Sequence, residues 1–171
     1  MHINPEAIER HTLSVTVDNE AGVLARIAGL FTARGYNIES LTVADITEDE
    51  AVSRITIVTS GTRAVIDQVV AQLDRLVPVH RVTDLSELGP HVERELALVK
   101  VAGVGEHRIE ALRLAEVYRA HVVDATTSSF IFEVTGGSDK IDKFLELMRE
   151  LGLVEVARTG VAAMARGKEA L

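Results

Sequence analysis

The chain has 171 residues and a formal charge of −8 at pH 7, from 26 acidic and 18 basic side chains. This length allows one medium domain or two small ones, each burying only about 60% of its unfolded surface. The acidic balance argues against nucleic acid as a partner, because binding to a phosphate backbone requires clustered Lys and Arg. The absence of cysteine excludes disulfides, thiolate metal sites and cysteine nucleophiles.

Nothing in the sequence indicates an export or membrane segment. Residues Met1–Glu6 lack an apolar signal-peptide core, and no apolar run approaches the roughly 18 residues that span a bilayer. The absence of cysteine agrees with a reducing compartment. We therefore expect a cytoplasmic protein with no membrane partner.

The first half of the chain predicts the element order βαββαβ. Residues 11–17 alternate apolar and polar side chains, as a strand does when one face lies in the core. Apolar residues at helical spacing follow as far as Arg34, and Gly35 has the position of a helix stop. A hairpin, a second helix and a fourth strand complete this half, at residues 36–44 with 52–59, from Gly61, and at 79–82.

The second half repeats this order after a break in periodicity. Its expected elements are a strand at 96–101, a helix at 106–119, a hairpin of 121–126 with 130–134, a helix at 138–151 and a strand at 153–158. The pattern therefore predicts an α+β protein of two ferredoxin-like βαββαβ domains. We place them at residues 11–84 and 95–166, joined by a linker at 85–94.

The joint between the first predicted strand and helix, Asp18–Leu24, is the strongest candidate for a binding site. The start of a helix leaves backbone N–H groups unpaired, and these favour a carboxylate. Asp18 or Asn19 can cap the helix or accept a ligand ammonium, and Gly22 has no Cβ to block a small molecule. The joint therefore suits a free amino acid. The alternative is an ordinary turn in which Asp18 and Asn19 only cap the helix.

A four-stranded sheet covered on one face leaves its other face and its edges bare. Here that face carries Thr and Ser among apolar residues, and such a sheet favours a partner. Pairing two copies would bring the joint of one copy near residues 36–40 of the other. A ligand bound there would touch both chains.

No catalytic or metal-binding constellation is visible in the sequence. The six histidines show no i,i+4 pair, so we expect no metal site. Gly103–Glu106 lacks the third glycine of a dinucleotide loop, and Gly136–Lys140 lacks the Walker spacing. The charged stretch His91–Glu95 is expected to be a solvated connector. These observations argue against an enzyme.

With these residues laid out, the chain resembles the regulatory (small) subunit of acetolactate synthase, also called acetohydroxyacid synthase, from about His11 to Gly167. The run Gly35–Val43 is the most specific carrier of the resemblance. The other carriers are Leu13–Val15, Asn19–Arg26, Ser53–Ile57, Val92–Leu96, Ile141 with Asp142, Glu155–Gly160, and Arg166 with Gly167.

The resemblance implies an N-terminal ACT domain, which is the amino-acid-sensing βαββαβ module, followed by an ACT-like C-terminal domain. It implies a homodimer whose ACT domains bind valine at their interface. The residues expected to hold valine are Asp18, Asn19, Gly22, Val23 and Leu24 of one chain with Asn37 and Ile38 of its neighbour, supported by Ala25, Thr42 and Ala44. Since relatives often carry Ser where this chain has Ala25, a hydroxyl contact is absent there, which bears on the strength of feedback.

The resemblance further implies that the chain performs no chemistry itself. It would bind the large catalytic subunit, which carries thiamine diphosphate, Mg²⁺ and FAD and condenses pyruvate with pyruvate or 2-oxobutyrate. It would raise that subunit's activity and confer inhibition by valine in the synthesis of valine, leucine and isoleucine. The alternative is a free-standing tandem ACT sensor that acts on transcription or on another biosynthetic enzyme. An intrinsic enzyme comes third.

Overall fold

The computed structural model describes residues 7–171, so the polar start Met1–Glu6 lies outside the described residues. Contacts within the chain define two compact units. The first unit comprises the residues up to Val92 together with Val161–Leu171, and the second comprises Glu93–Gly160. The chain therefore passes from one unit to the other twice. The boundaries drawn from the sequence, 11–84 and 95–166, stay a prediction.

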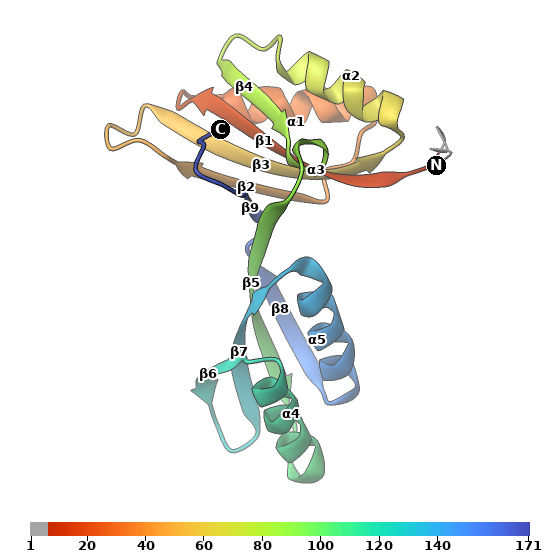
Figure 1. The fold of residues 1–171 in the computed structure, drawn as a ribbon. Coiled ribbons are helices and arrows are strands. Elements are labelled where there is room, and N and C mark those ends of the chain that lie inside the picture. The colour runs from red at the N-terminus through yellow and green to blue at the C-terminus, as the bar shows by residue number, and fades with distance from the viewer. Residues whose placement is uncertain (1–6) are drawn as a thin grey trace. The chain divides into compact units, whose positions relative to one another are not determined.

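The first unit has the predicted order βαββαβ (Figure 1). Its strands pair antiparallel in the order β2-β3-β1-β4, and α1 and α2 pack on one face of this sheet. A short helix, α3, follows the last strand. The elements are β1 (Glu9–Asp18), α1 (Val23–Arg34), β2 (Ser40–Asp45), β3 (Val52–Gly61), α2 (Arg63–Leu73), β4 (Val79–Asp84) and α3 (Leu85–Leu88).

The core of the first unit follows from the two periodicities in the sequence. Every second residue of β1 points toward the helices, and Leu13 and Val15 are fully buried there. The register places Leu13 opposite Ile57 of β3, so the apolar row continues across the sheet. Residues of α1 at helical spacing, such as Ile27 and Phe31, cover these rows. The apolar face thereby sets which side of the sheet the helices occupy.

The opposite face of this sheet is not bare. It carries Thr12, Ser14, Thr56 and Val58, each at most 4% exposed. Val161 belongs to the same unit, is 2% exposed, and is hydrogen bonded through its backbone to side chains of β2. The expectation of an uncovered Ser/Thr face was therefore wrong, because a segment far along the chain returns to this unit.

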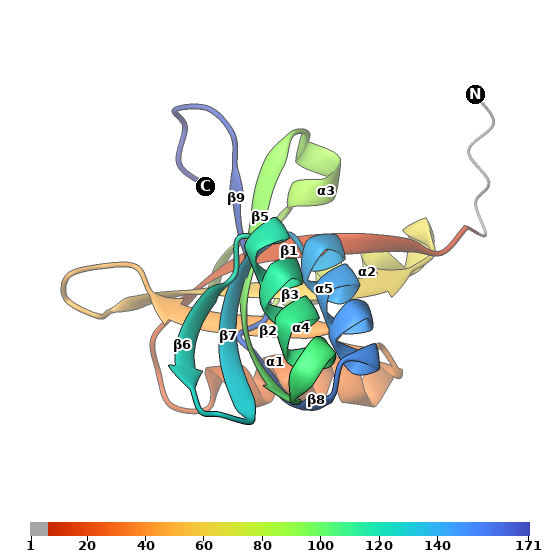
Figure 2. The ribbon, with the colours of Figure 1, turned by 90° about the horizontal axis from the view of Figure 1, so that it is seen from below.

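The second unit repeats the fold, with strand order β6-β7-β5-β8 and both helices on one face of the sheet (Figure 2). Its core is aromatic, with Phe132 and Phe144 packed edge to face at 6.1 Å between ring centroids. The predicted α+β class with two ferredoxin-like units is confirmed. The elements are β5 (His91–Ala102), α4 (Gly105–Val117), β6 (His121–Ala125), β7 (Ser129–Gly136), α5 (Ser138–Glu150) and β8 (Leu153–Arg158), and β9 (Ala162–Ala165) follows within the first unit's share of the chain.

The sequence predicts no membrane-spanning segment. Within residues 7–171 no helix combines the length and the apolar character needed to cross a bilayer.

The charged stretch His91–Glu95 forms the start of β5, so its reading as a solvated connector was wrong. Glu95 is 4% exposed, and the Arg158 guanidinium donates to both of its carboxylate oxygens, with 2.8 Å between Nη2 and Oε2. Ser138 Oγ donates to Oε2 at 3.2 Å, and Asp142 accepts from Arg158 Nη1 at 2.7 Å. These bonds, first of all those to Glu95, raise the pKa of Arg158. Bidentate pairing is what allows this carboxylate to be buried.

Candidate functional site

The joint between β1 and α1 is open at the start of the helix. Gly22 is the N-cap residue and adopts the left-handed conformation, with φ 87°. A Cβ built at Gly22 would meet no heavy atom within 4 Å, so the space beside this backbone is free. Gly22 offers no capping side chain, and the first turn of α1 has no acidic residue. The positive end of α1 is therefore not neutralised from within its own first turn, which favours an anion there.

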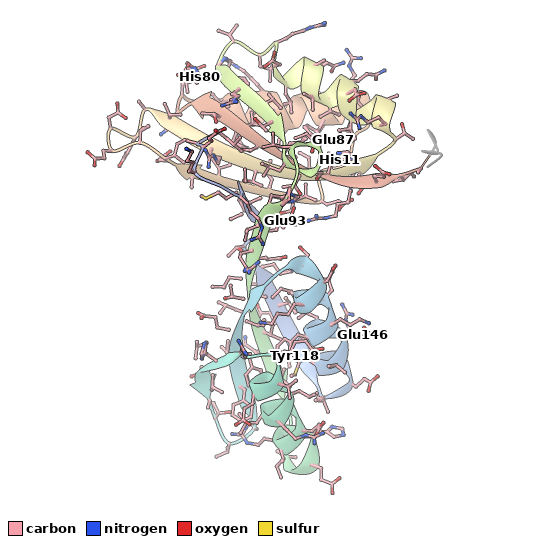
Figure 3. The ribbon with its side chains drawn as sticks, in the orientation of Figure 1. His11, His80, Glu87, Glu93, Tyr118 and Glu146 are labelled. Atoms are coloured by element: carbon pink, nitrogen blue, oxygen red, sulfur yellow. The ribbon has the colours of Figure 1, made fainter. Side chains whose placement is uncertain are left out.

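Asp18, the last residue of β1, contacts His80 of β4, which Figure 3 labels. Its Oδ1 lies 2.6 Å from Nε2 of His80, and both side chains are about half exposed. Its backbone N–H donates to the carbonyl of Pro78 at 2.8 Å. The sequence offered Asp18 as a helix cap or an ammonium acceptor. In the structure one carboxylate oxygen faces His80, which leaves Oδ2 for a ligand.

Asn19 is held by the turn between β2 and β3. Its side-chain Nδ2 donates to the carbonyl of Glu50 at 2.8 Å, and its backbone N–H donates to the carbonyl of Ala51 at 2.9 Å. Glu50 has a positive φ of 55°, which is uncommon for a residue other than glycine. The bond from Nδ2 orients the side-chain amide so that Oδ1 is the atom left to accept from an ammonium, and the backbone bond fixes the residue itself.

Val23 and Leu24 point in different directions, because successive helical residues are about 100° apart. Val23 is 4% exposed and belongs to the core under the sheet, so only its backbone can serve a ligand. Leu24 is 45% exposed and presents an apolar side chain beside the joint. Ala25 is exposed as well and adds no polar group to this surface.

Asn37 and Ile38 lie at the opposite end of the sheet from the joint. They precede β2, whose first residue, Ser40, pairs with Val58 of β3. The joint follows Asp18, which pairs with Val52 at the other end of β3. Val52 and Val58 are six residues apart along β3, which is about 20 Å at the rise of a strand. One chain alone therefore does not bring the two halves of the predicted valine site together.

Thr42 and Ala44 lie on the sheet face that points away from α1 and α2, since Thr42 pairs with Thr56 and Ala44 with Arg54. The Thr42 hydroxyl donates to the carbonyl of Val161 at 2.8 Å. The structure thus places this predicted supporting residue against the C-terminal segment.

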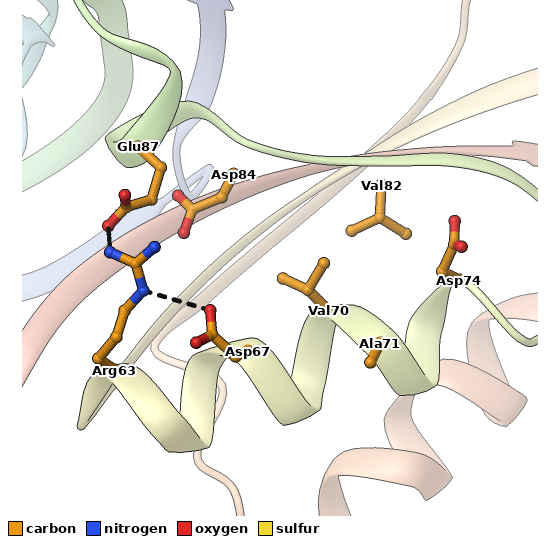
Figure 4. A pocket seen from close by; sticks show the side chains of 8 residues that line it. All are labelled: Arg63, Asp67, Val70, Ala71, Asp74, Val82, Asp84 and Glu87. Carbon is orange, nitrogen blue, oxygen red and sulfur yellow. Dashed lines mark hydrogen bonds and ion pairs between the residues drawn. The ribbon is translucent and has the colours of Figure 1, made fainter.

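A separate hollow lies along α2, between this helix, β4 and α3 (Figure 4). The Arg63 guanidinium bridges Asp67 at 3.2 Å and Glu87 at 2.5 Å. Carboxylates outnumber this one cation, so the hollow does not suit the carboxylate of an amino acid. It contains none of the predicted site residues. Its lining consists of Arg63, Asp67, Val70, Ala71, Asp74, Val82, Asp84 and Glu87.

Next to this hollow, His11, Asp84 and Glu87 each bring a potential metal-ligating atom within 4.8 Å of the others. His11 is 2% exposed, and its Nδ1 lies 2.7 Å from Asp84 Oδ2. Arg63 already supplies a positive charge to Glu87. In this arrangement the His11–Asp84 hydrogen bond and the Arg63–Glu87 ion pair fasten α3 to β1 and α2.

Sequence reasoning missed the partners of the joint, namely His80, Glu50 and Ala51. His80 lies 62 positions from Asp18, and Glu50 lies 31 positions from Asn19. Neither residue is in a recognisable motif. The one available signal was the predicted strand order, because β3 and β4 flank β1 in this fold.

Two family models match the chain, one in each half. Residues 13–81 match the small-subunit-like ACT domain of AHAS, and residues 94–167 match the small subunit of acetolactate synthase. The probable acetolactate synthase small subunit of Archaeoglobus fulgidus is 48% identical, over 94% of this chain and 99% of its own length. The isozyme 3 small subunit of Escherichia coli K12 is 47% identical, over 92% of this chain and 96% of its own.

A solved structure agrees with these matches. The crystal structure of the acetolactate synthase small subunit from Thermotoga maritima superimposes with a TM-score of 0.82 at 36% identity. The superposition covers 94% of this chain and 99% of that chain. Since the matches extend over both units, the chain belongs to the family of acetolactate synthase small subunits.

Proposed function

We propose that this chain is the regulatory subunit of a cytoplasmic acetolactate synthase. It binds the large catalytic subunit, raises its activity and confers inhibition by valine in branched-chain amino-acid synthesis. The chain itself carries out no reaction, and thiamine diphosphate, Mg²⁺ and FAD belong to the catalytic partner. The observation that carries the proposal is the match of both units to small subunits over nearly their whole length.

The joint supplies the chemistry for valine. The ligand carboxylate faces the first turn of α1, which contributes about 0.3–1 kcal/mol, or up to ~2 kcal/mol when partly buried. Asn19 Oδ1 and Asp18 Oδ2 accept from the ammonium, and hydrogen bonds to charged groups contribute about 1.5–3 kcal/mol each. Burying the isopropyl group beside Leu24 adds about 1.5–3 kcal/mol. After the cost of association this supports micromolar to millimolar binding, which suits a metabolite sensor.

A second copy completes the site in this proposal. In the sheet order β2 lies at an edge, and edges are where sheets of separate chains pair. If two β2 edges pair antiparallel about a twofold axis, the start of one β2 lies beside the end of the other. This pairing carries Asn37 and Ile38 of one chain toward the end of the sheet where its partner's joint lies.

Valine inhibits by binding more tightly to the arrangement in which the catalytic subunit is less active. Such coupling amounts to about 1–3 kcal/mol in allosteric proteins, or 5- to 150-fold in affinity. Because the proposed pocket spans two chains, a change in how the ACT domains pair is the part that moves.

The variant Asn19→Ala tests the ligand pose. It removes the amide that contacts the ammonium, so we expect valine binding to weaken about 10- to 100-fold, as for the loss of a hydrogen bond to a charged group. Activation of the catalytic subunit should persist. Isothermal calorimetry measures the first effect, and enzyme assay the second. Glu20→Gln is the control, because Glu20 is adjacent, exposed and paired with Arg26 rather than facing the ligand. Unchanged affinity in Asn19→Ala would refute the site.

One assay tests the function as a whole. Acetolactate formation by the catalytic subunit from the same organism is measured without this chain, with it, and with added valine. We expect the chain to raise activity and valine to lower it again. A chain that neither co-purifies with the catalytic subunit nor changes its rate would instead be a free-standing ACT sensor.

A further inference from the structure

Residues Val161–Leu171 return to the first unit, and we call them the C-terminal strap. Val161 is the most buried residue of the strap, at 2% exposure. Its backbone N–H donates to Ser40 Oγ at 2.8 Å, and its carbonyl accepts from Thr42 Oγ1 at 2.8 Å. Two side chains of β2 therefore pair with both polar groups of one backbone residue, much as a neighbouring strand would.

The strap has further contacts along its length. Arg166 donates through its backbone N–H to the carbonyl of Pro90 at 3.2 Å, and Leu171 accepts from Arg54 Nη2 at 3.3 Å. Ser40 and Thr42 share the sheet face of Thr56, which is 4% exposed. The low exposure of Thr56 shows that this face is covered. Polar side chains on a covered face need hydrogen-bond partners, since polar groups left unpaired away from water are costly.

The two segments joined at Val161 each continue along the chain into another segment of interest. The strand that carries Ser40 and Thr42 begins directly after Asn37 and Ile38, the segment proposed to contact valine from a second copy. On the other side, Val161 follows Gly160, the last residue of the second unit. A movement of β2 would therefore change the hydrogen bonds of Val161, the residue that follows the second unit in the chain.

We propose that Ser40 and Thr42 are positioning residues that latch the strap, and that Thr42 affects valine feedback by holding Val161 rather than by touching valine. The inference rests on the proposed function, because it assigns a route for that regulation. It differs from the resemblance, which implies that Thr42 lines or supports the ligand pocket. In the structure its hydroxyl is committed to the Val161 carbonyl.

Hydrogen exchange at the Val161 amide tests the latch directly, since this amide is protected while the strap is seated. Thr42→Val keeps the shape and removes the hydroxyl, so we expect exchange to accelerate about fivefold, as for the loss of one ordinary hydrogen bond. Thr42→Ser keeps the hydroxyl and should restore protection. The matched control is Thr32→Val, because the Thr32 hydroxyl bonds only within α1, to the Ala28 carbonyl. Equal exchange in Thr42→Val and wild type would overturn the latch.

Calorimetry and enzyme assay of the same variants test the regulatory role, with valine as the titrant and the catalytic subunit as partner. For Thr42→Val we expect the Kd of the isolated chain for valine to change less than about threefold, while the activity that the complex retains at saturating valine rises about fivefold. A raised Kd in the isolated chain, with full inhibition restored at saturating valine, would show that Thr42 contacts valine, and would overturn the inference. If wild-type chain bound no valine, the proposed function would fail, and the exchange measurement would still decide the latch.

Discussion

Replacing Gly22 by Asp is expected to give a protein that stays folded and activates the catalytic subunit but resists valine. The new carboxylate would lie at the N-cap of α1, where it accepts from the same backbone N–H groups that bind the ligand carboxylate. Two like charges about 4 Å apart repel by roughly 4 kcal/mol at an effective dielectric constant of 20. Allowing for solvent screening at this exposed joint, calorimetry should show an affinity about 100-fold lower.

Gly22→Asn separates charge from shape. Asn has nearly the size of Asp and, like Asp, tolerates the left-handed conformation seen at φ 87°, so both variants carry similar backbone strain. We expect Asn to weaken valine binding much less than Asp, and only the Asp effect to shrink as salt is added. Equal losses in the two variants would show that the site excludes bulk rather than negative charge, and would contradict the carboxylate pose.

Replacing Arg158 by Met is expected to destabilise the second unit by about 3–5 kcal/mol, as for a buried charge left without its partner. Glu95 is 4% exposed and would lose both guanidinium hydrogen bonds while its carboxylate stays buried. This is a large share of the roughly 5–15 kcal/mol that stabilises a typical domain. The double variant E95Q with Arg158→Met should recover part of the loss, because no buried charge remains.

The two tyrosines allow the second unit to be followed alone. Tyr118 belongs to the second unit and packs on Phe144 with 5.4 Å between centroids, whereas Tyr36 lies in the first unit. In a Tyr36→Phe background, denaturant unfolding monitored by tyrosine fluorescence therefore reports the second unit, which matters because two-unit chains need not unfold in one step. Lys100→Met, which also replaces a basic residue of the second unit, is the control for Arg158→Met.

Lys100 pairs with Glu155 at 2.6 Å, and the pKa of Glu155 is lowered by this neighbour, but both side chains are well exposed. Exposed pairs contribute little because water and salt screen them. We expect the unfolding midpoint to change little in Lys100→Met. A midpoint in Arg158→Met no lower than in this control would show that Glu95 does not depend on its partner.

Part of the site could be predicted from the sequence because it is local. Gly22, the start of the helix after it and the end of the strand before it lie within about ten consecutive residues, and propensity and periodicity act over that range. The helix opening with no cap side chain, the open space at Gly22 and the apolar Leu24 all follow from residues next to one another. The roles assigned to these residues toward valine remain predictions.

Other groups could not be predicted, since their partners are distant along the chain. Asp18 meets His80 across the sheet, and no rule of spacing selects that histidine among six. Likewise, Glu95 looked like one more charge in a charged stretch until β8 brought Arg158 alongside it, 63 positions away. A hydrogen bond can satisfy a buried charge only where the two groups actually meet.

By itself, the sequence determined the order of helices and strands, the apolar face of each and the repetition of one fold in both halves, since the 2.0 and 3.6 periods are properties of neighbouring residues. Only the tertiary structure decided that Val161 returns to β2, 121 positions from Ser40, and covers the face that the pattern left bare. The reason is physical: such a contact depends on the path of the whole intervening chain, which no local preference encodes.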